Sequence, residues 1–223
     1  MNCVIFANGP LAMDSLDAQA IRQFDLIIAT DGGAVHCHSH NLTPDLVVGD
    51  MDSIPGWLLN ELRLLGVETR TFPQRKDQTD LELALDMAVT RGAGEIVILG
   101  ALGERWDMSI SSVMLLASPR YAGTRITLTT GATTLFCLKG PTQSEFAGCP
   151  GDRLSIIPLS NPAAGVSLQG LEFPLAGCDI PLGSTLGISN VVTADKVGIA
   201  LSEGVLLCVH EKTGTSTPVA SGT

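Results

Sequence analysis

The sequence predicts an α/β fold in its first half and an antiparallel β fold in its second half. In the first half, short apolar runs alternate with helical patterns, as in a layered α/β domain. In the second half, no long helical stripe occurs, and Gly, Pro, Asn and Asp separate short β-rich runs. The pattern changes near Lys139-Gly140-Pro141. We therefore expect an α/β domain over residues 1–139, a β-sandwich over residues 140–212 and a flexible tail over residues 213–223.

The candidate strands of the first half are short and rich in β-branched residues. Several are apolar throughout, which is typical of strands covered on both faces of a parallel sheet. We therefore expect a Rossmann-like, mostly parallel sheet. The candidates are Val4–Ala7, Leu26–Thr30, Leu46–Gly49, Glu68–Phe72, Glu95–Leu99 and Arg125–Thr129.

Three helices are predicted between these strands. The first covers Trp57–Leu65 and ends at Gly66, a residue type that favours a helix C-terminus. The second begins after Thr79, which forms a capping-box pattern with Glu82. The third covers Met108–Ala117. The second helix carries an amphipathic stripe of Leu81, Ala84, Leu85 and Ala88.

The second half contains candidate strands of an antiparallel sandwich, and Glu203-Gly204 resembles a hairpin turn. These strands are Leu154–Leu159, Gly165–Leu168, Thr185–Val192, Val197–Leu201 and Gly204–His210.

The composition restricts the partners of the protein. Apolar residues make up 45% of the chain and charged residues 16%, so it can bury a core. The formal net charge of −10 disfavours nucleic acid and anionic membrane surfaces as partners. No apolar run is long enough to cross a bilayer, the six cysteines form no CxxC pair, and the first residues resemble a strand rather than a signal peptide. We therefore expect a cytoplasmic protein.

Aspartates follow the predicted strands at the edge where ligands bind in open parallel sheets. Carboxylate oxygens there suit Mg²⁺, which combines one or two carboxylates with water and substrate phosphates. Any one of these aspartates alone is more often a turn former or a helix cap. Because all of them fall at one edge, we favour a metal site that handles a phosphorylated substrate. The aspartates are Asp31, Asp50, Asp52, Asp77, Asp80 and Asp107.

The ordered motifs around these residues resemble those of thiamine pyrophosphokinases over nearly the whole chain. The first-half motifs are Asp31-Gly32-Gly33-Ala34, Pro44-Asp45, Gly49-Asp50-Met51-Asp52-Ser53, Lys76-Asp77-Gln78-Thr79-Asp80 and Leu99-Gly100-Ala101-Leu102-Gly103-Glu104-Arg105-Trp106-Asp107. The second-half motifs are Gly170-Leu171-Glu172-Phe173-Pro174-Leu175 and Gly187-Ile188-Ser189-Asn190.

The resemblance implies an enzyme that uses Mg²⁺ and ATP to place a diphosphate on the hydroxyl of thiamine, releasing AMP. It implies a homodimer in which the first domain binds ATP and the β-sandwich binds thiamine and dimerises. The implied metal ligands are Asp50, Asp52 and Asp80, which with Asp107 and Arg105 form the catalytic set. The implied nucleotide contacts are Asp31, Gly32, Lys76, Asp77, Gln78 and Thr79, and the implied thiamine contacts are Ser189 and Asn190.

The sequence departs from the family pattern around Asp107. Glu104 replaces a Gly, Met108 replaces a His, and Ser112 replaces an Asn. Two alternatives therefore stay open. One is a related pyrophosphokinase that acts on another hydroxymethyl heterocycle, such as a pterin. The other is a nucleotide- or thiamine-binding protein with low turnover.

Overall fold

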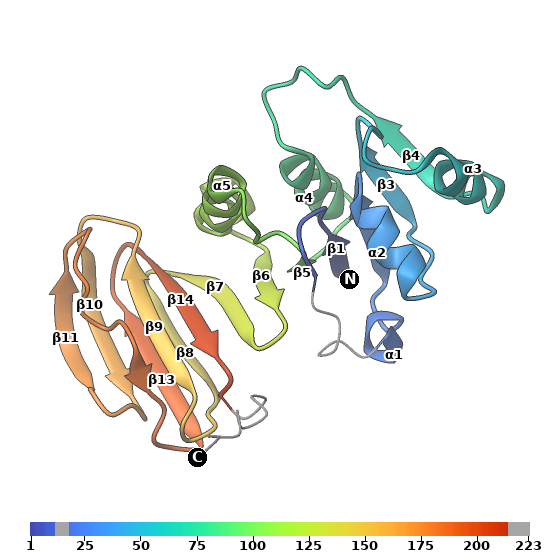
Figure 1. The fold of residues 1–223 in the computed structure, drawn as a ribbon. Coiled ribbons are helices and arrows are strands. Elements are labelled where there is room, and N and C mark those ends of the chain that lie inside the picture. Colours follow the sequence, from blue (N-terminus) through green and yellow to red (C-terminus); the bar gives the residue numbers. More distant parts are fainter. Residues whose placement is uncertain (12–17, 214–223) are drawn as a thin grey trace, which may run out of the picture. The chain divides into compact units, whose positions relative to one another are not determined.

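A computed structural model describes residues 1–11 and 18–213 (Figure 1). The chain divides into two compact units, Met1–Gly131 and Ala132–Thr223. The sequence predicted a boundary at residue 140, whereas the second unit already includes β7 (Thr133–Lys139), because β7 pairs along its full length with β14 (Val205–Glu211). The predicted tail lies, apart from Thr213, outside the described residues.

The first unit contains a parallel sheet with the strand order β6-β5-β1-β2-β3-β4. Its strands are β1 (Asn2–Phe6), β2 (Leu26–Thr30), β3 (Leu46–Gly49), β4 (Glu68–Thr71), β5 (Glu95–Leu99) and β6 (Arg125–Thr130). Its helices are α1 (Ala18–Ile21), α2 (Gly33–Ser39), α3 (Gly56–Leu64), α4 (Asp80–Thr90), α5 (Trp106–Ala117) and the 3₁₀ turn η2 (Pro119–Tyr121). The bounds of β2, β3 and β5 are those predicted.

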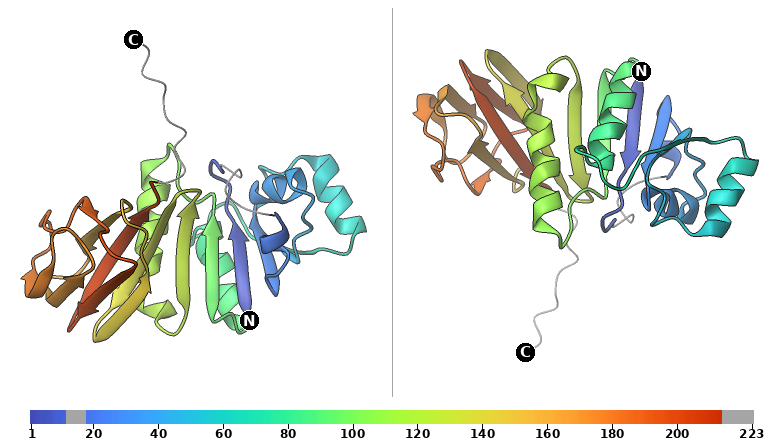
Figure 2. Two further views of the ribbon diagram at one scale, coloured as in Figure 1. Left: turned by 90° about the horizontal axis from the view of Figure 1, so that it is seen from below. Right: turned by 90° about the horizontal axis from the view of Figure 1, so that it is seen from above.

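Helices cover both faces of this sheet, with α2 and α3 on one face and α4 and α5 on the other (Figure 2). The α2–α3 face is a continuous apolar core in which Val4, Phe6 and Val47 pack against Ala34 and Leu58. Because side chains alternate along a strand, the intervening residues face α4, which contacts β1, β2 and β3. This two-sided burial explains why the central strands β1, β2, β3 and β5 are largely apolar. Within the described ranges, no helix is long and apolar enough to cross a membrane.

The second unit contains two antiparallel sheets around a shared core, as predicted for a β-sandwich. One sheet has the order β12-β9-β14-β7 and the other the order β11-β10-β13-β8. Side chains from both sheets, including Ile156, Val166 and Cys208, form one buried cluster. The remaining strands are β8 (Thr142–Ala147), β9 (Arg153–Pro158), β10 (Ala163–Gln169), β11 (Leu175–Ile180), β12 (Asn190–Val191) and β13 (Lys196–Leu201).

Three details of the second unit differ from the prediction. β7, β8 and β11 were not predicted as strands, and only Asn190–Val191 of the predicted run Thr185–Val192 is a strand. Glu203-Gly204 is not a hairpin turn, because the strands before and after it belong to different sheets. The predicted strand Thr185–Val192 was too long because its turn residues lie among apolar residues.

Candidate active site

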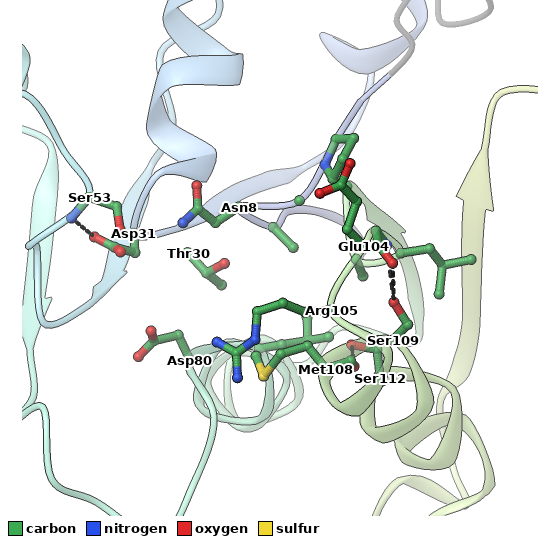
Figure 3. Close-up of a pocket in the computed structure, with 18 of the residues that line it drawn as sticks. Asn8, Thr30, Asp31, Ser53, Asp80, Glu104, Arg105, Met108, Ser109 and Ser112 are labelled. Atoms are coloured by element: carbon green, nitrogen blue, oxygen red, sulfur yellow. Dashed lines mark hydrogen bonds between the residues drawn. The ribbon is translucent and has the colours of Figure 1, made fainter.

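A cavity of about 480 Å³ opens at the carboxyl edge of the parallel sheet (Figure 3). Loops after β1, β2, β3 and β5 contribute to its wall, together with the first residues of α4 and the first turns of α5. The predicted convergence of these strand ends is therefore present. In Figure 3, Asp31 and Asp80 lie on one side of the cavity and Glu104 lies on the other.

Three carboxylates of this wall lie close enough to hold one metal ion. One oxygen each of Asp31, Asp50 and Asp52 lies within 4.8 Å of the other two. The loop after β3 holds them in place, because Asp52 N donates to Asp50 Oδ1 (3.2 Å) and Ser53 Oγ donates to Asp52 Oδ1 (3.0 Å). The sequence predicted the trio Asp50, Asp52 and Asp80. In the structure Asp31 joins the first two, while Asp80 lines the same cavity outside this group.

Asp31 is the most buried of these carboxylates, with 6% of the residue exposed. It lies directly after β2 with a φ of 44°, a left-handed conformation that Asp tolerates better than most residues. Ser53 N donates to Asp31 Oδ1 at 3.2 Å. Burial raises the pKa of Asp31, the hydrogen bonds from Ser53 lower it in part, and the charges of Asp52 and Asp50 raise it further. Burial and the neighbouring carboxylates thus destabilise the ionised form of Asp31, and a bound cation would stabilise it.

Asp80 is the first residue of α4, next to its N-cap Thr79. Lys76 Nζ lies 3.0 Å from Asp80 Oδ1 and also donates a hydrogen bond to Pro73 O at 3.2 Å. Asp80 Oδ1 is buried, and its partner among the described residues is this ammonium group. Gly49 has a φ of 149°, and a Cβ there would lie 3.1 Å from Asp31 Cβ, so this glycine leaves space for the neighbouring Asp31. A carboxylate oxygen at the cavity wall is a suitable cation ligand.

The loops after β1 and β5 form the Gly-rich side of the cavity. Gly9 N donates to Gly100 O at 2.7 Å, and a Cβ at Gly9 would lie 2.5 Å from that oxygen. His36 of α2 contacts Gly9 O through Nε2 at 2.9 Å. His38 is exposed, whereas His36 is half-buried and holds this loop in place.

The first turns of α5 form the opposite wall. Ser109 Oγ accepts from Gly103 N (3.0 Å) and donates to Gly103 O (3.1 Å), so one hydroxyl fixes the loop before the helix. Ser112 Oγ donates to Met108 O at 2.8 Å. Glu104 is exposed and lines the cavity.

Arg105 and Asp107 form an exposed pair at the start of α5. Arg105 Nη2 lies 2.6 Å from Asp107 Oδ2, and the side chains are 74% and 66% exposed. The hydrogen bond from Arg105 lowers the pKa of Asp107, and the same bond raises the pKa of Arg105. Arg105 lines the cavity, whereas Asp107 is absent from its wall.

The segment predicted to contact nucleotide has structural partners of its own. Thr79 Oγ1 accepts from Glu82 N at 3.2 Å, which is the predicted helix cap. Gln78 Nε2 donates to Asp86 Oδ2 at 3.0 Å, on the side of α4 away from the cavity wall. Asp77 is exposed. Gly32 packs against the Asn8 side chain, which leaves no space for a Cβ.

Ser189 and Asn190 lie in the second unit at the start of β12. Asn190 is 2% exposed, and its amide exchanges hydrogen bonds with the backbone of Phe173, with N to Oδ1 at 3.0 Å and Nδ2 to O at 2.7 Å. Asn190 therefore joins the loop before β12 to the loop that contains Phe173. Ser189 has a φ of 57° and donates its N–H to Ser155 Oγ at 2.9 Å.

Both units match families of known function. The catalytic domain of thiamin pyrophosphokinase matches residues 18–128, and the vitamin B1 binding domain of thiamin pyrophosphokinase matches residues 143–206. The chain belongs to the thiamin pyrophosphokinase family.

Known relatives and solved structures agree with membership of this family. A thiamine pyrophosphokinase of Bacillus subtilis is 29% identical over 186 residues, which cover 83% of this chain and 86% of the relative. The crystal structure of a thiamine pyrophosphokinase from the same organism has a TM-score of 0.84 at 26% identity and covers 96% of this chain and 100% of its own. A Geobacillus thermodenitrificans thiamin pyrophosphokinase structure has a TM-score of 0.81 at 28% identity, with coverages of 97% and 100%.

Several residues of the cavity wall were not predicted from the sequence as site residues. The loop after β1 was treated only as the end of a strand, although Asn8 lies at the same sheet edge as the aspartates. The strand-end rule, applied to every strand, would have found it. The missed residues are Ala7, Asn8, Gly9, Pro10, Thr30, Ser53, Leu81 and Ser109.

Proposed function

We propose that this chain transfers the β,γ-diphosphate of ATP to the hydroxyl of thiamine. The convergence of acidic side chains on one cavity, in a chain of this family, carries the proposal. The hydroxyl oxygen bonds to the β-phosphorus of ATP and loses its proton. The bond between that phosphorus and the oxygen bridging to the α-phosphate breaks, and AMP leaves with the electron pair. The products are thiamine diphosphate and AMP.

The donor set of the cavity fits a divalent metal, and Mg²⁺ is the ion that we propose. Asp50 and Asp52 would hold it with Asp80, whose buried Oδ1 is paired with the Lys76 ammonium, and Asp31 lies within reach. All these ligands are carboxylate oxygens, which Mg²⁺ prefers. Bound Mg²⁺ would neutralise phosphate charge and polarise the phosphorus under attack.

The chain's own groups would bind and orient the nucleotide. Gly9 and Gly100 let the loops after β1 and β5 pack backbone against backbone at the cavity wall, and Lys76 offers a cation beside Asp80. Arg105 reaches the cavity from the α5 side, with Asp107 as its partner. The remaining residues of the proposed nucleotide site are Asp31, Gly32, Asp77, Gln78 and Thr79. Gln78 and Thr79 would act through the turn that they stabilise.

We further propose that the chain is a homodimer and that Ser189 and Asn190 shape the thiamine site. Asn190 would act through the loops that it joins, because its amide is committed to backbone. Exposed apolar residues in these loops, Phe173, Leu182 and Ile188, support an interface there. The cysteines described are free thiols, which supports a cytoplasmic location.

The test is AMP release from ATP and Mg²⁺ with thiamine, with a hydroxymethyl pterin and with no acceptor. AMP that forms only with thiamine supports the proposal. AMP that forms only with the pterin would assign the chain to the related pyrophosphokinase. If the protein binds ATP but releases no AMP with either acceptor, it is a low-turnover binding protein.

A further inference from the structure

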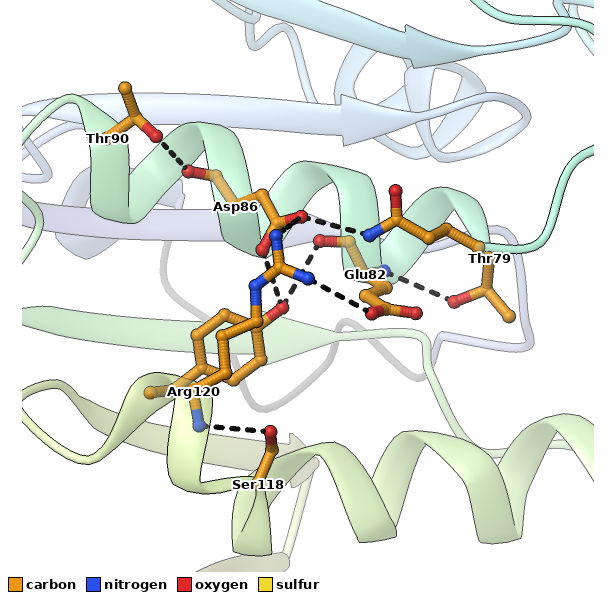
Figure 4. Close-up of polar contacts among 8 residues, drawn as sticks. Thr79, Glu82, Asp86, Thr90, Ser118 and Arg120 are labelled. Atoms are coloured by element: carbon orange, nitrogen blue, oxygen red, sulfur yellow. Dashed lines mark hydrogen bonds and ion pairs between the residues drawn. The ribbon is translucent and has the colours of Figure 1, made fainter.

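Asp86, a residue of α4, lies outside the cavity wall at the centre of a polar network between α4 and the 3₁₀ turn η2 (Figure 4). Gln78 Nε2 donates to Asp86 Oδ2 at 3.0 Å, and the Tyr121 hydroxyl donates to Asp86 Oδ1 at 2.9 Å. Arg120 Nη2 lies 2.7 Å from Asp86 Oδ2. One carboxylate thus receives three donors from two separate segments.

One of these segments adjoins the cavity wall at Asp80, and the other follows the helix α5, whose first turns form the opposite wall. Gln78 belongs to the turn that leads into α4, whose first residue is Asp80. Arg120 and Tyr121 belong to η2, which follows α5 almost directly, and the first turns of α5 line the cavity. Asp86 therefore connects the entry to α4 with the exit from α5.

The contacts differ in strength because their burial differs. Tyr121 is 2% exposed, so its hydroxyl depends on a protein acceptor. Burial and the Asp86 carboxylate raise the pKa of Tyr121, so it stays a donor at neutral pH. Arg120 is 56% exposed, so its ion pair contributes less. The bond to Gln78 is the one that reaches toward the cavity.

We propose that Asp86 is a positioning residue, which holds the Gln78–Asp80 turn and so orients the Asp80 carboxylate toward the metal–nucleotide complex. The inference rests on the proposed function of the cavity. Because the Gln78 amide is bonded to Asp86, Gln78 acts through this network and not by direct contact with the nucleotide.

The test compares Asp86→Ala with the matched control Glu68→Ala. Glu68 also accepts from two donors, Arg70 Nε (2.7 Å) and Arg91 Nη2 (2.6 Å), but lies on β4 outside the cavity wall. The measurements are thermal unfolding, the affinity for Mn²⁺-ATP by calorimetry, and kcat with the KM for thiamine. We expect Asp86→Ala to weaken Mn²⁺-ATP binding about fivefold and to lower kcat about tenfold, with an unchanged KM for thiamine. Glu68→Ala should lose stability only.

Gln78→Leu provides a second line of evidence if Asp86→Ala does not fold. It should weaken Mn²⁺-ATP binding in the wild-type background. In an Asp86→Ala background that folds, it should add nothing, because both changes break one contact. Wild-type Mn²⁺-ATP affinity and kcat in a folded Asp86→Ala protein would overturn the inference, and so would additive effects. A wild-type protein that binds Mn²⁺-ATP but makes no AMP would refute the proposed function alone, since the binding comparison still stands.

Discussion

Asp31 combines burial, a left-handed backbone and two neighbouring carboxylates. Asp31→Asn keeps the acceptor for Ser53 N and tolerates the same φ, but removes the charge. Without metal, we expect this variant to be more stable than the wild type by about 1 kcal/mol, or about 2–4 °C in the unfolding midpoint. Thermal scans with and without Mg²⁺ check this. A lower midpoint in the metal-free variant would show that the carboxylates do not repel one another.

Asp80 presents a buried carboxylate oxygen, whose partner among the described residues is the Lys76 ammonium group. Asp80→Asn should reduce AMP release about 100-fold or more at saturating Mg²⁺, because it removes a proposed metal ligand. Such a loss corresponds to about 2.7 kcal/mol of transition-state stabilisation. Circular dichroism should show a folded protein. Glu95→Gln, at the exposed start of β5, is the control and should keep full activity. Full activity of Asp80→Asn would rule out Asp80 as a ligand.

Glu104 places a carboxyl in a loop that approaches phosphate in our proposal. Glu104→Gly and Glu104→Gln both remove the charge, and only Gly also removes the side chain. If charge alone weakens ATP binding, both should lower the KM for ATP two- to fivefold, the range of an exposed charge interaction. A drop in activity of both variants would instead give Glu104 a role of its own.

Among the elements, α4 depends most clearly on one cap. Thr79→Ala removes the acceptor for Glu82 N and should cost about 1 kcal/mol, which lowers the midpoint by about 2–4 °C. Thr79→Ser keeps the acceptor and should unfold close to the wild type. Equal midpoints for the Ala and Ser variants would show that this cap contributes nothing.

Strands and helices that are specified by their own local sequence could be predicted from the sequence. Burial on two faces makes β2, β3 and β5 apolar apart from Thr30 at the end of β2 and Glu95 at the start of β5, and their bounds are as predicted. β8 (Thr142–Ala147) was missed because it begins with four polar residues after a Pro, and its position depends on pairing with the distant β13. Long-range pairing of this kind leaves little trace in a short window.

At the scale of the whole molecule, the rule of strand ends located the cavity, because parallel strands bring distant residues to one edge. The rule gave the edge but not the direction of each side chain. Asp31 therefore joins the metal-binding group, Gln78 turns to Asp86, and Asp107 lies off the cavity wall. The directions of these side chains depend on hydrogen bonds between segments that are distant in the sequence, and a local sequence pattern does not show those bonds.

The most direct test of the central claim follows the γ-phosphate of labelled ATP in a single turnover with thiamine and Mg²⁺. Transfer of the intact β,γ-diphosphate predicts label in thiamine diphosphate and one AMP for each molecule formed. It also predicts that both products disappear together in Asp50→Asn, which removes a carboxylate of the metal-binding group. Label in inorganic phosphate, or in thiamine monophosphate with ADP, would contradict diphosphate transfer by this cavity.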